Sequence, residues 1–385
     1  MVARPAGAGY RLQKYVRRHR FGVAAATVIA LLLIAFGVVQ AVQLRRITRE
    51  RDRADRIADF MTGLFKASDP NERVGRAVTA SDLLDKGAKN IDASLSGDPQ
   101  LQARMMYVMG RAYMYLGLYP RAESLFERGI QLSGTAGSKE SRETLNTMHD
   151  LGWTLLQEGR LTEAESLQRK LVETQTRVLG PDHPDTLASI SSLALTLCQQ
   201  GHCAEAARLN REVLEKQKRI LGPEAHFTVV TMDNLAMMLG EDGRPAEAEQ
   251  LEKQALAIHL RTEGPENFAT IICMINLGDS QRDLRQDEEA EKTFRQALDI
   301  EGRIFGPDQP ETAATRYDLA SVLVRGGQSQ EAIQLLRQAV DHGLTPQADL
   351  ELEKDPLFSS LHGNPQFEAI VMDARQRAAT AQHTK

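Results

Sequence analysis

The apolar and polar positions of this chain follow three successive patterns. Residues 21–42 are mostly apolar and contain no charged side chain. Residues 43–97 alternate charged and apolar positions at three- and four-residue spacing, which predicts amphipathic helices. From residue 98 to residue 344 the helical spacing continues, and the pattern itself recurs every 42 residues. Such a period is typical of a protein built from stacked copies of one structural unit.

Four columns of residues define the repeated unit. A small residue preceded by Leu or Met recurs at Gly110, Gly152, Ala194, Ala236, Gly278 and Ala320. An alanine recurs at Ala122, Ala164, Ala206, Ala248, Ala290 and Ala332. Between these columns stand Gly117, Gly159, Gly201, Gly243 and Gly327, with Arg285 at that position in the fifth unit. Gly-Pro pairs follow at Gly180-Pro181, Gly222-Pro223, Gly264-Pro265 and Gly306-Pro307.

Each column has a physical role in a helical hairpin. The small residue of the first helix and the alanine of the second let two backbones approach closely, and the glycine between them suits a tight turn. The Gly-Pro pair ends the second helix, because Gly favours the left-handed position after a helix and Pro cannot continue it. A single hairpin cannot bury its apolar face. We therefore predict an all-α fold, a right-handed α-solenoid of six helical hairpins over residues 98–344, preceded by one transmembrane helix.

The apolar segment is long enough to cross a membrane. Its 22 residues span about 33 Å as a helix, and a bilayer core is roughly 30 Å thick. A buried helix of a soluble protein would have a polar face, and a cleaved signal peptide would have a shorter apolar region and a small-residue cleavage site. We expect a retained anchor at residues 21–42, in contact with the lipid bilayer. The next segment, 43–97, is expected to hold a helix that leaves the membrane, a break at Ser68–Asn71, and a second helix capped by Thr79 or Ser81.

The charges are unevenly distributed. Residues 1–49 hold nine basic and no acidic residues, whereas residues 50–385 hold 38 basic and 52 acidic ones. An acidic body disfavours nucleic acid as a partner. The basic tail, residues 1–20, is expected to stay in the cytoplasm, since a long C-terminal domain can translocate largely regardless of its charge. This places the chain in the inner membrane as a single-pass protein with extracytoplasmic repeats.

The candidate chemistry of the chain is sparse. Three cysteines, Cys198, Cys203 and Cys273, form no disulfide framework and indicate no redox compartment. The run from Cys198 through His202 to Cys203 lacks a second ligand pair at zinc spacing, so no metal site and no cofactor are predicted. No nucleophile-elbow or other catalytic motif occurs, so we predict no catalytic residue. After residue 344 the period ends, and residues 345–385 are expected to form a C-terminal cap and, from about residue 376, a frayed polar tail.

The concave face of the predicted solenoid is the candidate binding site for protein or peptide partners. In this architecture the first helix of each hairpin lines the groove. The groove positions are expected to be occupied by Tyr107, Arg111, Tyr115, His149, Trp153, Gln157, Asn234, Asn276, Asp279 and Arg282. Trp153, the single Trp, is either an interface hot spot or a residue packed between neighbouring helices. The two asparagines either hold a peptide backbone or are ordinary surface residues. The oligomeric state is left open.

The columns resemble the tetratricopeptide repeat, whose pattern places Leu-Gly in the first helix and Ala in the second. The Leu-Gly/Ala and Ala columns match throughout, but Trp is missing from the first column and Tyr is kept only at Tyr113. The longer period and the junction 179–187 look like the kinesin-light-chain type of repeat. This resemblance implies a solenoid that binds other proteins and has no catalysis of its own.

Residues 4–95 are similar to the juxtamembrane segment of bacterial serine/threonine protein kinases that carry C-terminal repeats. The similarity lies in the run 10–20, in Phe60–Phe65, in Ser68–Pro70 and in Val78–Ala80. In that family a cytoplasmic kinase domain precedes this segment. No glycine-rich phosphate loop, His-Arg-Asp loop or Asp-Phe-Gly motif occurs in this chain. The resemblance thus implies an alternative function, the sensor or scaffold portion of a split or truncated kinase signalling system.

Overall fold

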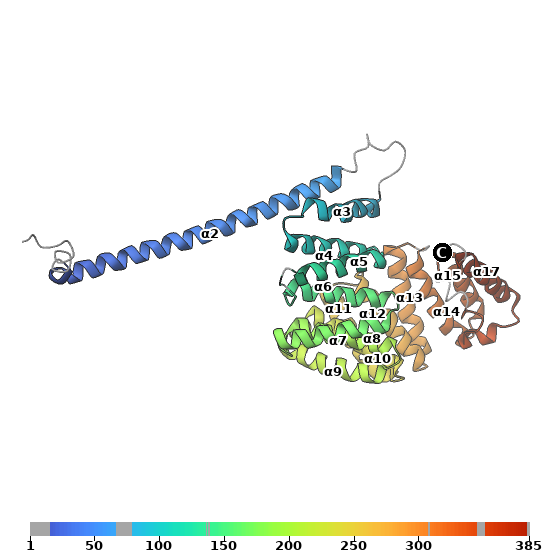
Figure 1. Cartoon of the computed structure of the whole chain (residues 1–385). Helices are drawn as coiled ribbons and strands as arrows, with labels where there is room; N and C mark the ends of the chain where they lie inside the picture. Colours follow the sequence, from blue (N-terminus) through green and yellow to red (C-terminus); the bar gives the residue numbers. More distant parts are fainter. Residues whose placement is uncertain are drawn as a thin grey trace, which may run out of the picture. The chain divides into compact units, whose positions relative to one another are not determined.

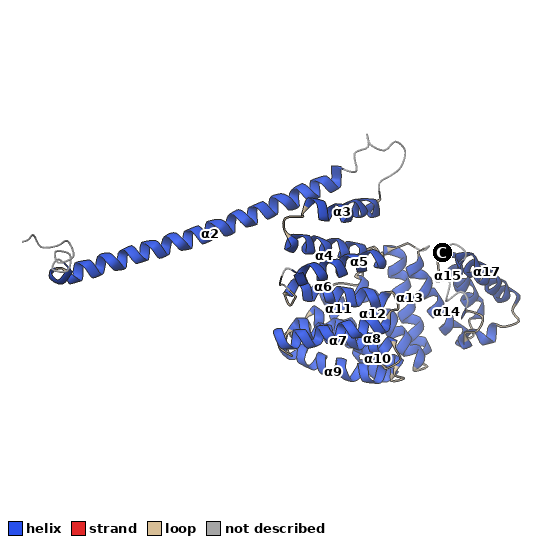
Figure 2. Ribbon diagram, viewed as in Figure 1, coloured by secondary structure: helices blue, strands red, loops and turns tan. Residues whose placement is uncertain are grey.

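The computed structural model describes residues 16–66, 79–135, 137, 139–306, 309–344 and 351–382 (Figure 1). Every regular element in these residues is a helix, so the all-α prediction is confirmed (Figure 2). The chain divides into two compact units, Met1–Gly137 and Ser138–Lys385. Most of the basic tail and the break expected at Ser68–Asn71 lie outside the described residues.

Unit 1 contains a long N-terminal helix and the first hairpin. Its helices are α2 (Arg20–Lys66), α3 (Ala80–Ser94), α4 (Pro99–Tyr115) and α5 (Tyr119–Thr135). The predicted apolar segment and the amphipathic stretch after it form one continuous helix, α2, of 47 residues (Figure 1). Among the described residues, α2 is the helix long and apolar enough to cross a bilayer, by length and composition, with a candidate span at Leu31–Thr62.

Hydrogen bonds and ion pairs fix the starts of α3 and α4. The Thr79 hydroxyl accepts from the backbone N–H of Asp82, and the Asp82 carboxylate accepts from the backbone N–H of Thr79. This capping box confirms Thr79 as the N-cap. Asp98 caps α4 by accepting from the backbone N–H of Leu101 at 3.1 Å. Its carboxylate also pairs with Nε of Arg53 at 2.9 Å, which ties α2 to the first hairpin.

Unit 2 contains five further hairpins, stacked side by side in Figure 1. Their helices are α6 (Arg142–Gln157) and α7 (Leu161–Val178), α8 (Pro184–Gln199) and α9 (Cys203–Ile220), α10 (His226–Glu241) and α11 (Pro245–Thr262), α12 (Phe268–Asp283) and α13 (Asp287–Ile304), and α14 (Pro310–Arg325) and α15 (Ser329–His342). Consecutive first helices begin 42 residues apart, and so do consecutive second helices. With α4 and α5 these hairpins make the six predicted repeats.

Left-handed residues reverse the chain at both ends of each hairpin. The turn glycine Gly243 has a φ of 74°. In the fifth repeat Arg285 takes the same position with a φ of 61°, the one positive φ outside glycine among the described residues. At the junction, Gly222 has a φ of 98°, and its carbonyl accepts a hydrogen bond from the Thr228 hydroxyl at 2.8 Å. The same bond recurs from Thr186 to Gly180 and from Thr270 to Gly264.

The small-residue column marks the closest approach of the two helices in a hairpin. A Cβ atom placed on Gly278 would lie 2.6 Å from the ring of Phe294, and Gly110 stands in the same relation to Phe126. In the sixth repeat the same positions hold Ala320 and Leu336, both fully buried. The prediction that this column permits close packing is confirmed.

The C-terminal segment covers the last hairpin. A short 3-10 helix η1 (Pro356–Leu361) and α17 (Pro365–Gln382) follow α15. Phe358 and Phe367 are fully buried in one core with residues of α14 and α15. The polar tail expected from residue 376 is instead helical to Gln382, because Ala378 is buried and extends the packed face of α17.

Candidate functional site

The first helices of unit 2 lie on one side of the stack. Each contacts the first helix of the next repeat: α6 contacts α8, α8 contacts α10, α10 contacts α12, and α12 contacts α14. Successive second helices approach each other less closely. A stack of repeats curves toward the row of helices that is drawn together. The first helices of unit 2 therefore form one row on the inner side of the curve, and this row carries the positions predicted to line a groove.

In unit 1 the three predicted groove residues of α4 form one cluster. The guanidinium carbon of Arg111 lies 5.7 Å from the ring centroid of Tyr107 and 5.2 Å from that of Tyr115. Arg111 also donates a hydrogen bond to the Tyr115 hydroxyl. Residues four apart on a helix face the same side, and a cation within about 6 Å of an aromatic ring is attracted to it. The Tyr115 side chain is 69% exposed, so the cluster presents aromatic surface to solvent.

At the start of unit 2, α6 carries the next three predicted residues. His149 is half-buried, and its Nε2 lies 3.1 Å from Oγ of Ser192 on α8. This contact runs along the concave face from one repeat to the next. Trp153 is half-buried and Gln157 is exposed, and neither side chain makes a hydrogen bond within the described residues. The indole N–H of Trp153 therefore stays free for a partner.

Two asparagines occupy the same position in successive repeats. Asn234 on α10 and Asn276 on α12 are 42 residues apart, and both are half-buried. Neither side-chain amide makes a hydrogen bond within the described part of the chain. Each amide offers two N–H donors and a carbonyl acceptor, the complement of a peptide group. The concave face thus carries unused hydrogen-bonding groups at repeat spacing.

The fifth repeat ends the row with an ion-pair network. Nη1 of Arg282 lies 2.8 Å from Oδ1 of Asp279 and 3.1 Å from Oδ1 of Asp318 on α14. Burial raises the pKa of Asp279, and the nearby carboxylate of Asp318 adds to this effect, whereas Arg282 opposes it. The Arg282 side chain is 15% exposed. Nε of Arg282 also lies 3.6 Å from Oδ1 of Asp283, so one guanidinium serves three carboxylates and is not itself a free cation.

Sequence reasoning missed two members of this network. Asp318 stands 42 residues after Asn276, in the same column, so extending the column by one repeat would have found it. Arg325 donates to the backbone carbonyl of Arg282 at 3.0 Å and also pairs with Asp287. The contacts of Arg325 form only when neighbouring repeats pack together, and the sequence around Arg325 does not predict them.

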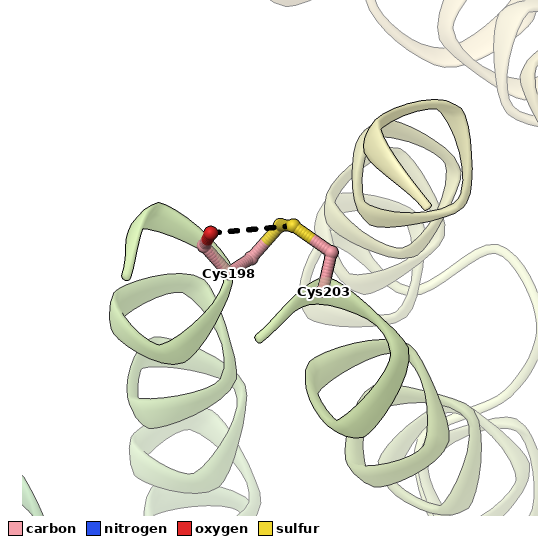
Figure 3. The surroundings of a disulfide bond; sticks show 2 residues. All are labelled: Cys198 and Cys203. Carbon is pink, nitrogen blue, oxygen red and sulfur yellow. Dashed lines mark hydrogen bonds between the residues drawn. A yellow bond between two sulfur atoms is a disulfide. The ribbon is translucent and has the colours of Figure 1, made fainter. Parts of the chain in front are cut away.

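Cys198 and Cys203 form a single disulfide, a pairing that the sequence analysis did not predict (Figure 3). The turn at Gly201 reverses the chain between α8 and α9 and brings the two Cα atoms within 4.0 Å. Figure 3 also shows the Cys203 sulfur close to the Cys198 carbonyl oxygen. A bonded sulfur has no proton to donate, so this is a packing contact. The pairing also removes both thiols as metal ligands.

A hollow of about 880 Å³ opens beside this disulfide. Its wall includes both cysteines, His202 and Glu205 of the α9 start, and Met237 of α10. None of the ten predicted groove residues lines it. In the described part of the chain one group of three side chains could hold a metal ion, namely Asp233, His259 and Cys273. It is separate from the cysteine-histidine run considered in the sequence.

Comparisons with known proteins found several similar solved structures. No curated protein sequence matches the chain. The kinesin-light-chain-type protein of Podosopora anserina with nearly identical TPR-like repeats has 28% identity over 51% of this chain and 92% of its own, with a TM-score of 0.46. BtubC of P. vanneervenii has 21% identity over 68% of this chain and 90% of its own, with a TM-score of 0.45. The apo form of RapI has 12% identity over 74% of this chain and 100% of its own, with a TM-score of 0.53.

The sequence profile of the tetratricopeptide repeat gives the assignment. It matches residues 101–170, 154–219, 227–301 and 270–342, which together make up more than half of the chain. These matches cover the helices from α4 to α15. The chain belongs to the tetratricopeptide repeat family.

Proposed function

We propose that this protein is a membrane-anchored tetratricopeptide repeat scaffold that binds protein or peptide partners on the concave face of its first helices. It has no catalysis of its own in this proposal. One observation carries the proposal: Asn234 and Asn276 repeat at the same position of adjacent first helices with their amides unused. When a ligand covers a half-buried amide, the amide loses its hydrogen bonds to water. The ligand must supply new hydrogen bonds to compensate for this loss.

The spacing of the asparagines favours an extended ligand. Packed helices lie roughly 10 Å apart, and an extended chain rises about 3.3 Å per residue. Adjacent repeats would therefore contact peptide groups about three residues apart. The carboxylates of Asp279, Asp283 and Asp318 share Arg282 and leave an acidic excess beyond Asn276. A ligand segment with Lys or Arg near that end would complement this charge.

Peptide selection and affinity measurements test this proposal. Peptides selected from a random library on the full chain would be titrated calorimetrically against Asn234→Ala and Asn276→Ala. Each variant should weaken binding about tenfold, because each removes a hydrogen-bond pair worth about 1 kcal/mol or more. The matched control is Gln254→Ala, which removes an exposed amide from the second helix α11. Unchanged affinity in both asparagine variants would contradict the groove proposal.

The anchoring proposal rests on α2 and on the disulfide. Leu31, Leu33 and Ile34 in α2 are 60–65% exposed, as expected of side chains that face lipid. Disulfides persist mainly outside the reducing cytosol. The pairing of Cys198 with Cys203 therefore supports extracytoplasmic repeats, with the N-terminus in the cytoplasm. Protease added to intact spheroplasts should digest the repeats, and protection of the repeats would contradict this orientation.

A second candidate is supported by the sequence of residues 4–95 alone. Its similarity to kinase juxtamembrane segments suggests that the chain serves as the sensor or scaffold part of a split or truncated kinase system. The DNA upstream of the Met1 codon tests this candidate. An in-frame kinase domain or an adjacent kinase gene would favour it, and a stop codon without a kinase gene would favour the free-standing scaffold.

A further inference from the structure

The interface between the fourth and fifth repeats holds three side chains of metal-binding type, of which two are buried and one is half-buried. Asp233 comes from α10, His259 from α11 and Cys273 from α12. One ligand atom from each lies within 4.8 Å of the other two. Nε2 of His259 is 2.9 Å from Oδ2 of Asp233, and the His259 and Cys273 side chains are each 1% exposed. Three helices thus direct an oxygen, a nitrogen and a sulfur toward one point.

The other repeats show that the fold does not require this cluster. One period earlier the same positions hold Ser191, Gln217 and Thr231, which are all buried. One period later they hold Ile275, Glu301 and Thr315. A small polar residue and a buried amide are therefore sufficient for packing at these positions. The combination of Asp, His and Cys occurs once in the register, and helix packing does not explain it.

Several polar atoms around the cluster are buried without a hydrogen bond. Within the described residues these include Oδ1 of Asp233, Nδ1 of His259 and Oε2 of Glu252. Nδ1 of His259 faces the Glu263 carboxylate at 3.5 Å. A carboxylate behind one ring nitrogen commonly orients a metal-binding histidine, because it keeps the proton on that nitrogen. The lone pair of the other nitrogen, Nε2, then faces Oδ2 of Asp233 at 2.9 Å, where an ion can be bound by both atoms.

We propose that Asp233, His259 and Cys273 bind a divalent transition metal of the zinc class. Thiolate and imidazole together favour Zn²⁺ over the oxygen-binding ions Mg²⁺ and Ca²⁺. The Asp233 side chain is 21% exposed, so an ion can enter from that side, and a water molecule completes four ligands. Binding forms a metal–sulfur bond and releases the thiol proton of Cys273 to solvent.

The site would join the repeats that carry the proposed peptide contacts. Asp233 precedes Asn234 in α10, and Cys273 lies three residues before Asn276 in α12. An ion held by α10, α11 and α12 would therefore stabilise the concave face at these two asparagines. The metal proposal does not depend on peptide binding, because it is tested by metal alone.

Cobalt titration of the full chain in detergent tests the proposal. The protein is stripped with chelator in the absence of reductant, so that Cys273 is the free thiol and the disulfide stays intact. Added Co²⁺ should produce a sulfur-to-cobalt charge-transfer band and the visible absorption bands of a four-coordinate Co²⁺ ion. These bands should saturate at one equivalent per chain and disappear when Zn²⁺ is added. Absence of the bands at millimolar Co²⁺ would overturn the proposal.

Substitutions by the residues that stand one period earlier, Thr231 and Gln217, remove single ligands and introduce side chains that the fold already holds at these positions. Cys273→Thr should abolish the charge-transfer band, and His259→Gln should weaken Co²⁺ binding tenfold or more. The matched control His202→Gln removes an imidazole at the start of α9, outside the cluster, and should bind Co²⁺ as the original chain does. Circular dichroism checks the folding of each variant. Bands that persist in both ligand variants would also overturn the proposal. If a variant misfolds, the Co²⁺ titration of the unaltered chain still tests the proposal.

Discussion

At the scale of single residues, the repeats differ where one position departs from the column. Arg285 keeps a left-handed backbone that glycine provides in every other repeat described. Glu252 places a carboxyl in the core at 2% exposure, where the second repeat has Gln168 and the third has Asn210. At such positions the side chain destabilises the local structure. Substitution by the residue usual in the column measures how much free energy of unfolding is lost.

Arg285→Gly should stabilise the protein. A side chain with a Cβ pays about 1–2 kcal/mol for left-handed backbone, and glycine adds some entropy to the unfolded chain, so a net gain of about 1 kcal/mol is expected. The gain appears as a higher midpoint of thermal unfolding by circular dichroism. Arg285→Ala is the control, because it removes the charge but keeps the Cβ. Equal stabilisation by both substitutions would show that the charge, not the backbone, is responsible.

Glu252→Gln should make stability less dependent on pH. Burial, with the carboxylates of Asp233 and Glu249 nearby, raises the pKa of Glu252 to about 7, although a Ser280 hydrogen bond opposes this. The folded pKa exceeds the unfolded one, so the stabilisation from the protonated acid is complete below the unfolded pKa and is lost as the pH rises through about 7. Relative to the original chain, the variant should gain about 2 kcal/mol between pH 5 and pH 8.

Thermal unfolding at the two pH values, in the presence of chelator, measures this difference. The exposed Glu241 of α10 supplies the control Glu241→Gln, which should behave alike at both pH values. A gain for Glu252→Gln that is the same at pH 5 and pH 8 would contradict a raised pKa.

At the scale of helices, the packing between the two helices of a hairpin (the seam) depends on pairs of facing residues, one from each helix. Glycine in the first helix faces Phe in the second at Gly278–Phe294 and at Gly110–Phe126. Alanine accompanies a smaller partner at Ala320 and Leu336. The volumes of the two positions therefore compensate each other, as close packing requires.

Gly278→Ala should destabilise the fifth hairpin by about 1–3 kcal/mol, because the new Cβ would overlap the buried ring of Phe294. Adding Phe294→Leu recreates the pair of the sixth repeat and should recover about 1 kcal/mol or more of the loss. Thermal unfolding of the two single variants and the double variant gives the coupling. Gly302→Ala in α13 meets no atom within 4 Å and should instead stabilise its helix by about 1 kcal/mol. Additive effects of the two seam substitutions would rule out compensation.

At the scale of the whole molecule, the period predicted most of the fold and the local sequence predicted little of the site. The columns predicted the hairpin turns and the close seam, because each depends on contacts within one repeat. The disulfide was missed, since Cys198 and Cys203 meet only after the chain has reversed at Gly201. The ion pair of Arg282 with Asp318 joins two repeats and follows from the column only when adjacent repeats are compared.

The disulfide makes a prediction about the protein in its cell. Alkylation of the protein in isolated cell fractions without prior reduction should modify one cysteine, Cys273, and only after unfolding, because its side chain is 1% exposed. Reduction before alkylation should raise the number to three. Mass-tagging of thiols and gel electrophoresis count them. Three modified cysteines without reduction would place the repeats in a reducing compartment and contradict the proposed orientation.

The regular restart of the helices has a genetic consequence. Every first helix in unit 2 begins 42 residues after the previous one, and the junctions at Gly180, Gly222 and Gly264 share one backbone conformation. Recombination between the DNA of two junctions would delete or duplicate one whole hairpin and rejoin equivalent ends. The product keeps its reading frame and its internal seams, so the number of repeats, and with it the length of the concave face, can change in a single event.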